Sequence, residues 1–197
     1  MDSIANGEKE QGDIAYAAKD YNAAIMHYEK VIASGDTNLD TMSKIAMAYF
    51  LVKQYDLAET FAKRAIAAKD GNQKPPFLAY VALLSCLFIK KDSNQIISIS
   101  NEVINFAQSA VEKSYGLAYR GLGYYLWEKF EEALNDFNES LKLDPYNTLA
   151  LEYRGTMYFK QKRYVESLQD LQKVIKLSPK NKVAITLIPK LERIVGI

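Results

Sequence analysis

Hydrophobic residues recur at intervals of three and four positions along most of the chain, and short polar segments interrupt them. This spacing places side chains on one face of an α-helix, so it predicts a succession of amphipathic helices. In the middle of the chain it predicts helices over residues 79–90 and 95–106, joined by the polar turn Lys91-Asp92-Ser93-Asn94. The sequence therefore predicts an all-α fold of paired helices.

Two C-terminal segments, residues 114–147 and 148–181, align with each other without a gap, so the chain repeats there with a period of about 34 residues. Glycine, aromatic, small or apolar residues and proline fall at corresponding places in both. In the first segment they are Gly121, Tyr124, Phe130, Ala133, Phe137 and Pro145, and in the second Gly155, Tyr158, Tyr164, Ser167, Leu171 and Pro179. Landmarks that recur at a fixed period indicate an internal repeat.

The same period marks two units near the N-terminus. Their landmarks are Gly12, Tyr21, Ala24 and Tyr28, and then Ala46, Tyr49, Tyr55 and Ala58. A weaker unit over residues 77–110 follows an insertion around residues 71–76. It has Asn94 where an aromatic residue is expected and Ile97 where a small one is expected, so its register stays open.

The landmarks have a simple physical meaning. Glycine or alanine on the first helix lets the second helix approach, an aromatic residue fills the wedge at the turn, and a small residue receives the next unit. Proline ends each pair at Asp144-Pro145 and Ser178-Pro179, because the residue before proline avoids the helical region. Each pair leaves an apolar face uncovered, so stability depends on stacking.

This pattern resembles the tetratricopeptide repeat, and the resemblance covers nearly the whole chain. It implies a right-handed α-solenoid that forms one domain over residues 1–197. About five helix–turn–helix units are expected, at approximately 5–38, 39–72, 77–110, 114–147 and 148–181, followed by a capping helix over 182–197.

The capping helix is expected to cover the last repeat with one apolar face, and Pro189 is expected to kink it. A tail that binds a partner is the alternative. The apolar residues are Val183, Ile185, Leu187, Ile188, Leu191, Ile194 and Val195.

Composition offers no candidate for catalysis. The chain has one histidine, His27, and one cysteine, Cys86, so a zinc site and a Cys–His pair both lack ligands or partners. We therefore expect no enzyme activity, no cofactor and no metal. A single cysteine favours a reducing, cytoplasmic location. The longest apolar stretch, residues 77–89, is too short to span a membrane.

The resemblance also implies a concave groove lined by the first helix of each unit, where a protein or peptide partner binds. Counting from the glycine and alanine landmarks gives the candidate groove residues. They are Lys9, Tyr16, Lys44, Met47, Phe50, Tyr115, Tyr119, Leu122, Tyr125, Tyr153 and Phe159, with Asp13, Ala82, Cys86, Ile89, Glu152 and Thr156 beside them. Aromatic side chains of this kind favour an apolar or amphipathic segment, bound as a helix or as an extended strand.

Co-chaperones of this family grip the C-terminal carboxylates of heat-shock proteins with lysine, arginine and asparagine residues. Lys9 matches the first of these positions, but Asp13 and Lys44 stand where asparagines are expected. Ala82 and Cys86 stand where the third unit would supply two bases. We therefore keep this function only as the alternative to a scaffold or adaptor with an apolar groove.

Charge is distributed unevenly along the chain. Residues 1–36 carry three Lys and seven Asp or Glu, a net charge of −4, and residues 148–197 carry ten Lys or Arg and four Asp or Glu, a net charge of +6. This asymmetry, together with the apolar groove, leaves self-association open. The total net charge of +1 gives no reason to expect a nucleic acid as partner.

Overall fold

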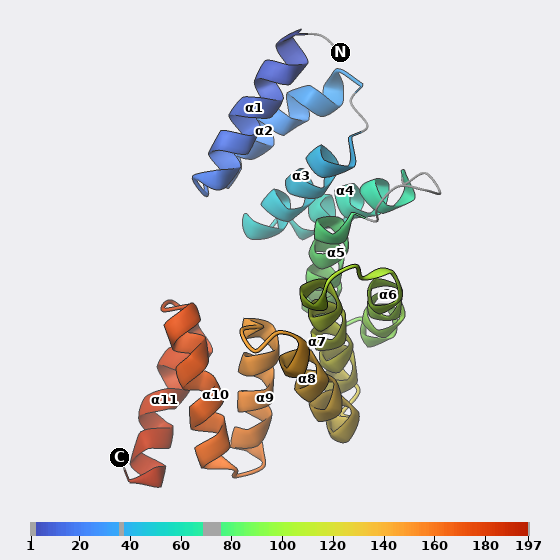
Figure 1. Cartoon of the computed structure of the whole chain (residues 1–197). Coiled ribbons are helices and arrows are strands. Elements are labelled where there is room, and N and C mark those ends of the chain that lie inside the picture. Colours follow the sequence, from blue (N-terminus) through green and yellow to red (C-terminus); the bar gives the residue numbers. More distant parts are fainter. Residues whose placement is uncertain (1–2, 36–37, 69–75, 197) are drawn as a thin grey trace. The chain divides into compact units, whose positions relative to one another are not determined.

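The computed structural model describes residues 3–35, 38–68 and 76–196. These residues form eleven α-helices and no strand, which confirms the predicted all-α fold (Figure 1). The helices belong to two compact units, one ending at Lys90 and the other beginning at Lys91. Apart from Pro76, the predicted insertion at residues 71–76 lies outside the described residues.

The first unit contains two helix pairs and one further helix. The helices are α1 (Ser3–Ala17), α2 (Tyr21–Ala33), α3 (Leu39–Leu51), α4 (Tyr55–Ala67) and α5 (Phe77–Lys90). Each pair packs internally, α2 packs on α3, and α5 packs on both α3 and α4. An apolar core of Ala24, Ile25, Tyr28, Ile45, Ala48, Tyr49, Ala58 and Cys86 joins these helices.

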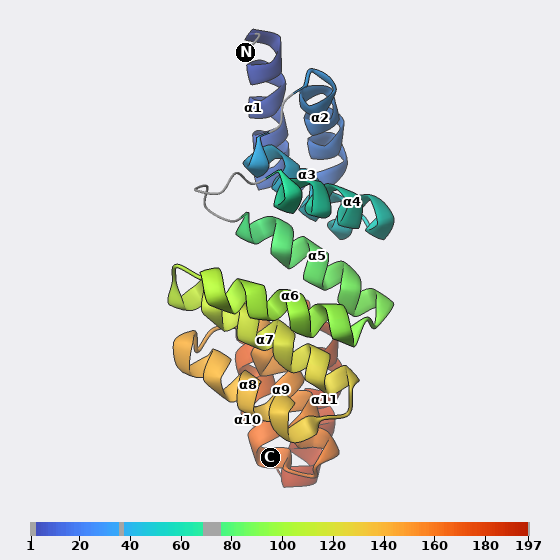
Figure 2. The same cartoon turned by 90° about the vertical axis from the view of Figure 1, so that its right-hand side faces the viewer.

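The second unit contains one helix, two pairs and a last helix. The helices are α6 (Ser93–Phe106), α7 (Ala110–Leu126), α8 (Phe130–Leu143), α9 (Thr148–Lys160), α10 (Tyr164–Leu177) and α11 (Lys182–Val195). Helix α6 lies along α7, as Figure 2 shows, and α8 packs on α9 and α10 on α11. The boundary at Lys90 and Lys91 falls inside the predicted third repeat, so α5 and α6 belong to different units.

Glycine allows the two helices of a pair to approach closely. A Cβ atom at Gly12 would lie 2.6 Å from Cε1 of Tyr28, and one at Gly121 would lie 2.8 Å from Cε1 of Phe137. Both aromatic side chains are fully buried, so neither has space to move aside. The predicted role of glycine is therefore confirmed for these two pairs. A Cβ at Gly123 would meet Ile97 at 2.6 Å, so α6 approaches α7 in the same way.

Every turn between the two helices of a predicted repeat contains one residue in the left-handed conformation, and none of these residues is glycine. They are Lys19, Lys53, Lys91, Glu128 and Lys162, with φ between 58° and 66°. In the last pair, the amide of Lys162 donates to the carbonyl of Phe159, and the amide of Arg163 donates to the carbonyl of Tyr158. This is the Schellman pattern, which satisfies carbonyls at the end of a helix.

The left-handed residues also fix the register of the third repeat. Lys91 occupies the place that Glu128 has in the fourth repeat. The aromatic landmark follows two residues later, so its place is Ser93 rather than Asn94. The small landmark follows five residues later, so its place is the buried Ile96 rather than Ile97. The expected register was therefore wrong by one residue.

The last helix, α11, covers apolar side chains of α9 and α10. Ala184 and Leu191 belong to its buried cluster, and Val183, Leu187, Ile188 and Val195 pack against that cluster. The predicted apolar face was wrong for two residues, since Ile185 is 53% exposed and Ile194 is 52% exposed. The helix runs through Pro189 as a single element.

A recurring set of polar contacts, here called the Arg–Asp–Asn frame, ties three successive helices of the second unit together. In α9, Arg154 donates from Nε and Nη2 to the carboxylate of Asp170 on α10, at 2.8 Å each, and from Nη1 to Asn138 on α8 at 2.8 Å. In α7, Arg120 makes the same contacts. Its partners are Asp136 on α8, at 2.8 and 2.7 Å, and Asn101 on α6, at 2.9 Å. Both carboxylates are buried.

We expect Gly121→Ala to lower the free energy of unfolding by about 1 to 2 kcal/mol. Overpacking against Phe137 costs about 1 to 3 kcal/mol, and the better helix propensity of alanine recovers part of it. Gly7→Ala is the matched control, because a Cβ at Gly7 would meet nothing within 4 Å. It should be neutral or stabilising by up to about 1 kcal/mol in urea unfolding. Equal effects of the two changes would contradict the close approach at Gly121.

We expect Lys162→Gly to raise the free energy of unfolding by about 0.5 to 1 kcal/mol. Glycine removes the steric cost of the left-handed conformation, which exceeds the entropy that its flexibility costs. Lys173→Gly, inside the right-handed helix α10, should instead destabilise by about 1 kcal/mol. Thermal unfolding of both variants checks the contrast, and destabilisation by both would mean that the turn at Lys162 is not strained.

Candidate functional site

The predicted groove residues Lys9 and Lys44 belong to an ion-pair network in the first unit. Asp13 accepts hydrogen bonds from Lys44 at 2.9 Å and from the buried hydroxyl of Tyr28 at 2.7 Å. Lys44 also pairs with Asp40 at 2.8 Å, and Lys9 lies 3.5 Å from Asp13 and 3.7 Å from Asp40. Two lysines thus face two carboxylates, and neither lysine is left to attract an anion.

Electrostatics within this network favours the charged forms of Asp13 and Lys44. Burial raises the pKa of Asp13, but the hydrogen bonds from Lys44 and Tyr28 outweigh it and hold that pKa below its usual value. Burial lowers the pKa of Lys44, but the hydrogen bonds to Asp13 and Asp40 outweigh it and raise that pKa. Burial and the bond to Asp13 raise the pKa of Tyr28. The network therefore holds α1, α2 and α3 together at neutral pH.

Four of the predicted groove aromatics form a recurring pair with the aromatic residue at the following turn. Each lies five residues before its partner and packs against it, which closes the wedge between two helices. The pairs are Tyr16 with Tyr21 and Phe50 with Tyr55, both at 5.6 Å between ring centroids, Tyr125 with Phe130 at 6.0 Å, and Phe159 with Tyr164 at 5.9 Å. These residues are only partly exposed, so packing accounts for much of their surface.

Two predicted groove residues offer no surface to a partner. Tyr119 is 7% exposed and Leu122 is fully buried, because both side chains point into the second unit. Ala82 and Cys86 are fully buried as well, and burial raises the pKa of the Cys86 thiol to about 11. We leave these four residues out of the candidate site.

Two of the remaining aromatics, Tyr125 on α7 and Tyr153 on α9, form a connected group with Lys160 on α9. These three residues are here called the aromatic ridge. The rings of Tyr125 and Tyr153 meet edge to face at 5.9 Å, and Tyr153 stacks on the buried Phe137 at 6.4 Å. The ammonium group of Lys160 lies 4.7 Å from the centre of the Tyr125 ring and donates to its hydroxyl. Burial raises the pKa of Tyr153, so its hydroxyl stays protonated.

The other predicted positions are separate from this ridge. Tyr115 on α7 and Met47 on α3 are each half-buried, and Ile89 at the end of α5 is 49% exposed. His27 lies against Glu8, with Nδ1 at 2.6 Å from Oε2. No group of three or more His, Cys, Asp or Glu among the described residues could hold a metal ion. None of the helices described is both long and apolar enough to cross a membrane.

Comparison with known proteins agrees with the fold of paired helices. A tetratricopeptide repeat model matches residues 148–181, which are the helix pair α9 and α10 with their flanking turns. The solved structure of TTC0263 from Thermus thermophilus, a TPR protein, has 16% identity and a TM-score of 0.74 over 95% of this chain and 98% of that one. Residues 148–181 thus match a tetratricopeptide repeat, and the chain shares the fold of TPR proteins.

Other solved structures share this fold. MamA from Desulfovibrio magneticus RS-1 (residues 41 to the end) is 15% identical, with a TM-score of 0.69 over 92% of this chain and 99% of that one. YrrB, described as a TPR protein with an unusual peptide-binding site, is 14% identical, with a TM-score of 0.58 over 93% of this chain and 96% of that one. At these identities the similarity concerns the fold alone.

The sequence analysis missed two features of the second unit. Lys160 was absent from the groove list, because counting from landmarks selected only the positions that the family uses. The Arg–Asp–Asn frame was missed although its signal is visible, since Arg120 and Arg154, and likewise Asp136 and Asp170, stand one repeat period apart. A charged residue that recurs at the repeat period indicates a structural role shared by the two repeats.

We expect acid to weaken the first unit partly through Asp13. Because the pKa of Asp13 is lowered on folding, its contribution is present above its unfolded value of 3.8 and is lost as the pH falls through the folded value. In urea unfolding, Asp13→Asn should therefore be less stable than the native protein at neutral pH, and the difference should shrink below pH 3.8. The exposed Glu10→Gln is the control, and a constant difference for Asp13→Asn would refute the network's role.

Proposed function

We propose that this protein is a non-catalytic interaction scaffold that holds a peptide or helical segment of a partner protein against the aromatic ridge. The observation that carries the proposal is the contact of Tyr125 with both Tyr153 and Lys160 at a partly exposed surface. Tyrosine offers a large contact area at low entropy cost, and its hydroxyl can bond to a peptide backbone.

The ridge is held in place before any partner arrives. Tyr153 rests on the buried ring of Phe137, and Tyr125 is fixed between Phe130, Tyr153 and Lys160. Side chains that are already ordered lose little rotamer freedom on binding, which favours affinity. Tyr115 is half-buried on α7 and extends the aromatic surface proposed here.

The comparisons add support of a general kind. YrrB is described as a TPR protein with a peptide-binding site, and this chain shares its fold at 14% identity. The proposed cytoplasmic location rests on the sequence, which has a single cysteine. Self-association remains a prediction.

The alternative, a co-chaperone that binds the acidic tail of a heat-shock protein, has less support. Lys9 is the base that matches the family's carboxylate clamp, and it lies beside Asp13 and Asp40. Lys44 is held by the same two carboxylates. An incoming carboxylate would have to displace them, which costs the ion pairs that they form.

Peptides selected from a random display library on the intact protein would test the proposal. Tyr125→Ala should weaken a selected peptide about tenfold, as expected for a tyrosine at the centre of an interface, and should lower the stability less than truncation of the buried Tyr119 does. Isothermal titration calorimetry gives the affinity, and thermal unfolding gives the stability.

Two controls separate binding from folding. Tyr146→Ala removes the most exposed aromatic side chain, 72% exposed and outside the ridge, and should leave the affinity unchanged. Tyr119→Ala removes a buried ring and should destabilise the protein by about 3 to 5 kcal/mol. The proposal is wrong if Tyr125→Ala leaves the affinity unchanged, or if Tyr146→Ala weakens binding equally.

A further inference from the structure

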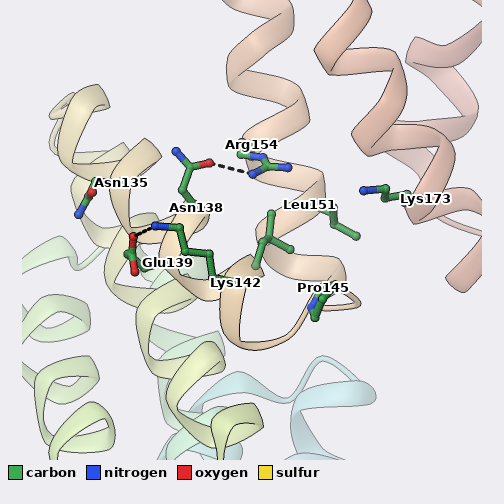
Figure 3. Close-up of a pocket in the computed structure, with 9 residues that line it drawn as sticks. Asn135, Asn138, Glu139, Lys142, Pro145, Leu151, Arg154 and Lys173 are labelled. Atoms are coloured by element: carbon green, nitrogen blue, oxygen red, sulfur yellow. Dashed lines mark hydrogen bonds and ion pairs between the residues drawn. The ribbon is translucent and has the colours of Figure 1, made fainter.

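A second site lies in the second unit, on residues that do not belong to the aromatic ridge. A cavity of about 420 Å³ opens between α8, the turn after it, α9 and α10. Figure 3 shows Asn138 and Lys142 on one side of it, Arg154 and Leu151 at its back, and Lys173 on the other side. Asn135, Glu139, Leu141 and Pro145 complete the lining.

The polar groups at the back of this cavity are oriented as hydrogen-bond donors. The guanidinium of Arg154 can only donate, and it donates to the side-chain oxygen of Asn138 at 2.8 Å. That bond fixes the orientation of the Asn138 amide and leaves its NH₂ group to donate elsewhere. The bidentate pair with Asp170 holds Arg154 itself in place. A ligand rich in acceptors, such as a carboxylate or a peptide carbonyl, matches this arrangement.

One positive charge in the lining is not balanced. Arg154 is paired with Asp170, and Lys142 is paired with Glu139 at 2.5 Å. Lys173 has no ion-pair partner among the residues that the structure describes, and in Figure 3 its ammonium group points from α10 toward the cavity. The unbalanced charge favours an anionic ligand.

The preceding repeat has the same frame but different charges around it. Arg120, Asp136 and Asn101 repeat the contacts of Arg154, Asp170 and Asn138. The place of Lys173 is taken one repeat period earlier by Glu139, and the α6 residue that corresponds to Lys142 is Asn105. The frame therefore has a structural role in both repeats, whereas Lys142 and Lys173 occur only at the cavity between α8, α9 and α10.

Apolar groups beside the lysines indicate the kind of anion. Leu141, Pro145 and Leu151 line the same cavity, so a bare inorganic ion would leave their surface uncovered. We propose that this cavity binds an acidic peptide segment of a partner protein. A glutamate or aspartate would pair with Lys173, a backbone carbonyl would accept from Asn138, and a neighbouring apolar side chain would lie on Pro145 and Leu141.

The probe is a short fluorescein-labelled peptide in which glutamate alternates with leucine, titrated against the full chain in fluorescence anisotropy. Native protein should bind it, more weakly at high salt because the ion pair is screened. Lys173→Glu, which copies the charge of the preceding repeat, should weaken binding about tenfold, and Lys173→Gln should weaken it less. Both substitutions are at an exposed residue, and thermal unfolding should show that each variant folds.

Lys176→Glu is the matched control, because Lys176 is an exposed lysine of the same helix that does not line the cavity. It should leave the affinity unchanged. The inference is overturned by an equal loss in Lys173→Glu and Lys176→Glu, by no binding to native protein, or by equal binding of a peptide with glutamine for glutamate. Displacement of the peptide by equimolar inorganic phosphate or oligouridylate would also overturn it.

Discussion

The close approach of the two helices in a pair, as in α1 with α2 and α7 with α8, is the constraint on which the structure depends. Gly12 and Gly121 leave no space for a side chain between the first helix and the aromatic ring that faces it. Once the helices are this close, the turn must be tight, and a residue such as Lys162 accepts the left-handed conformation. The aromatic pairs, for example Phe159 with Tyr164, then fill the wedge that remains at the turn.

The same constraint decides which aromatic side chains are left for binding. A first helix is covered on one side by its own partner and on another by the helix before it, as α7 is by α8 and α6. Tyr119 and Leu122 fall within this covered surface, while Tyr125 lies at its edge. The candidate ridge is therefore small, and it is rigid because its rings extend the packing of the core.

The helix pairs could be predicted from the sequence because glycine, aromatic and small residues recur at a fixed period. Exposure could not, because periodicity does not separate a side chain that packs between repeats from one that faces a groove, as Tyr119 shows. The third repeat was placed one residue out because Ser93 and Ile96 stand at its aromatic and small positions, so neither landmark marked the register. The pairing of Lys44 with Asp13 could not be predicted either, since it joins residues 31 apart.

The Arg–Asp–Asn frame has a consequence for how the second unit comes apart. Each arginine bonds to the helix after it and to the helix before it, so Arg154 connects α8, α9 and α10, and Arg120 connects α6, α7 and α8. Loss of one layer would strand a buried carboxylate, Asp170 or Asp136, without its counter-charge, which is energetically unfavourable. Stacked repeats can fray one at a time when neighbours are weakly coupled. These shared arginines strengthen the coupling between adjacent layers, so the five helices from α6 to α10 should melt as one cooperative block instead of peeling from an end.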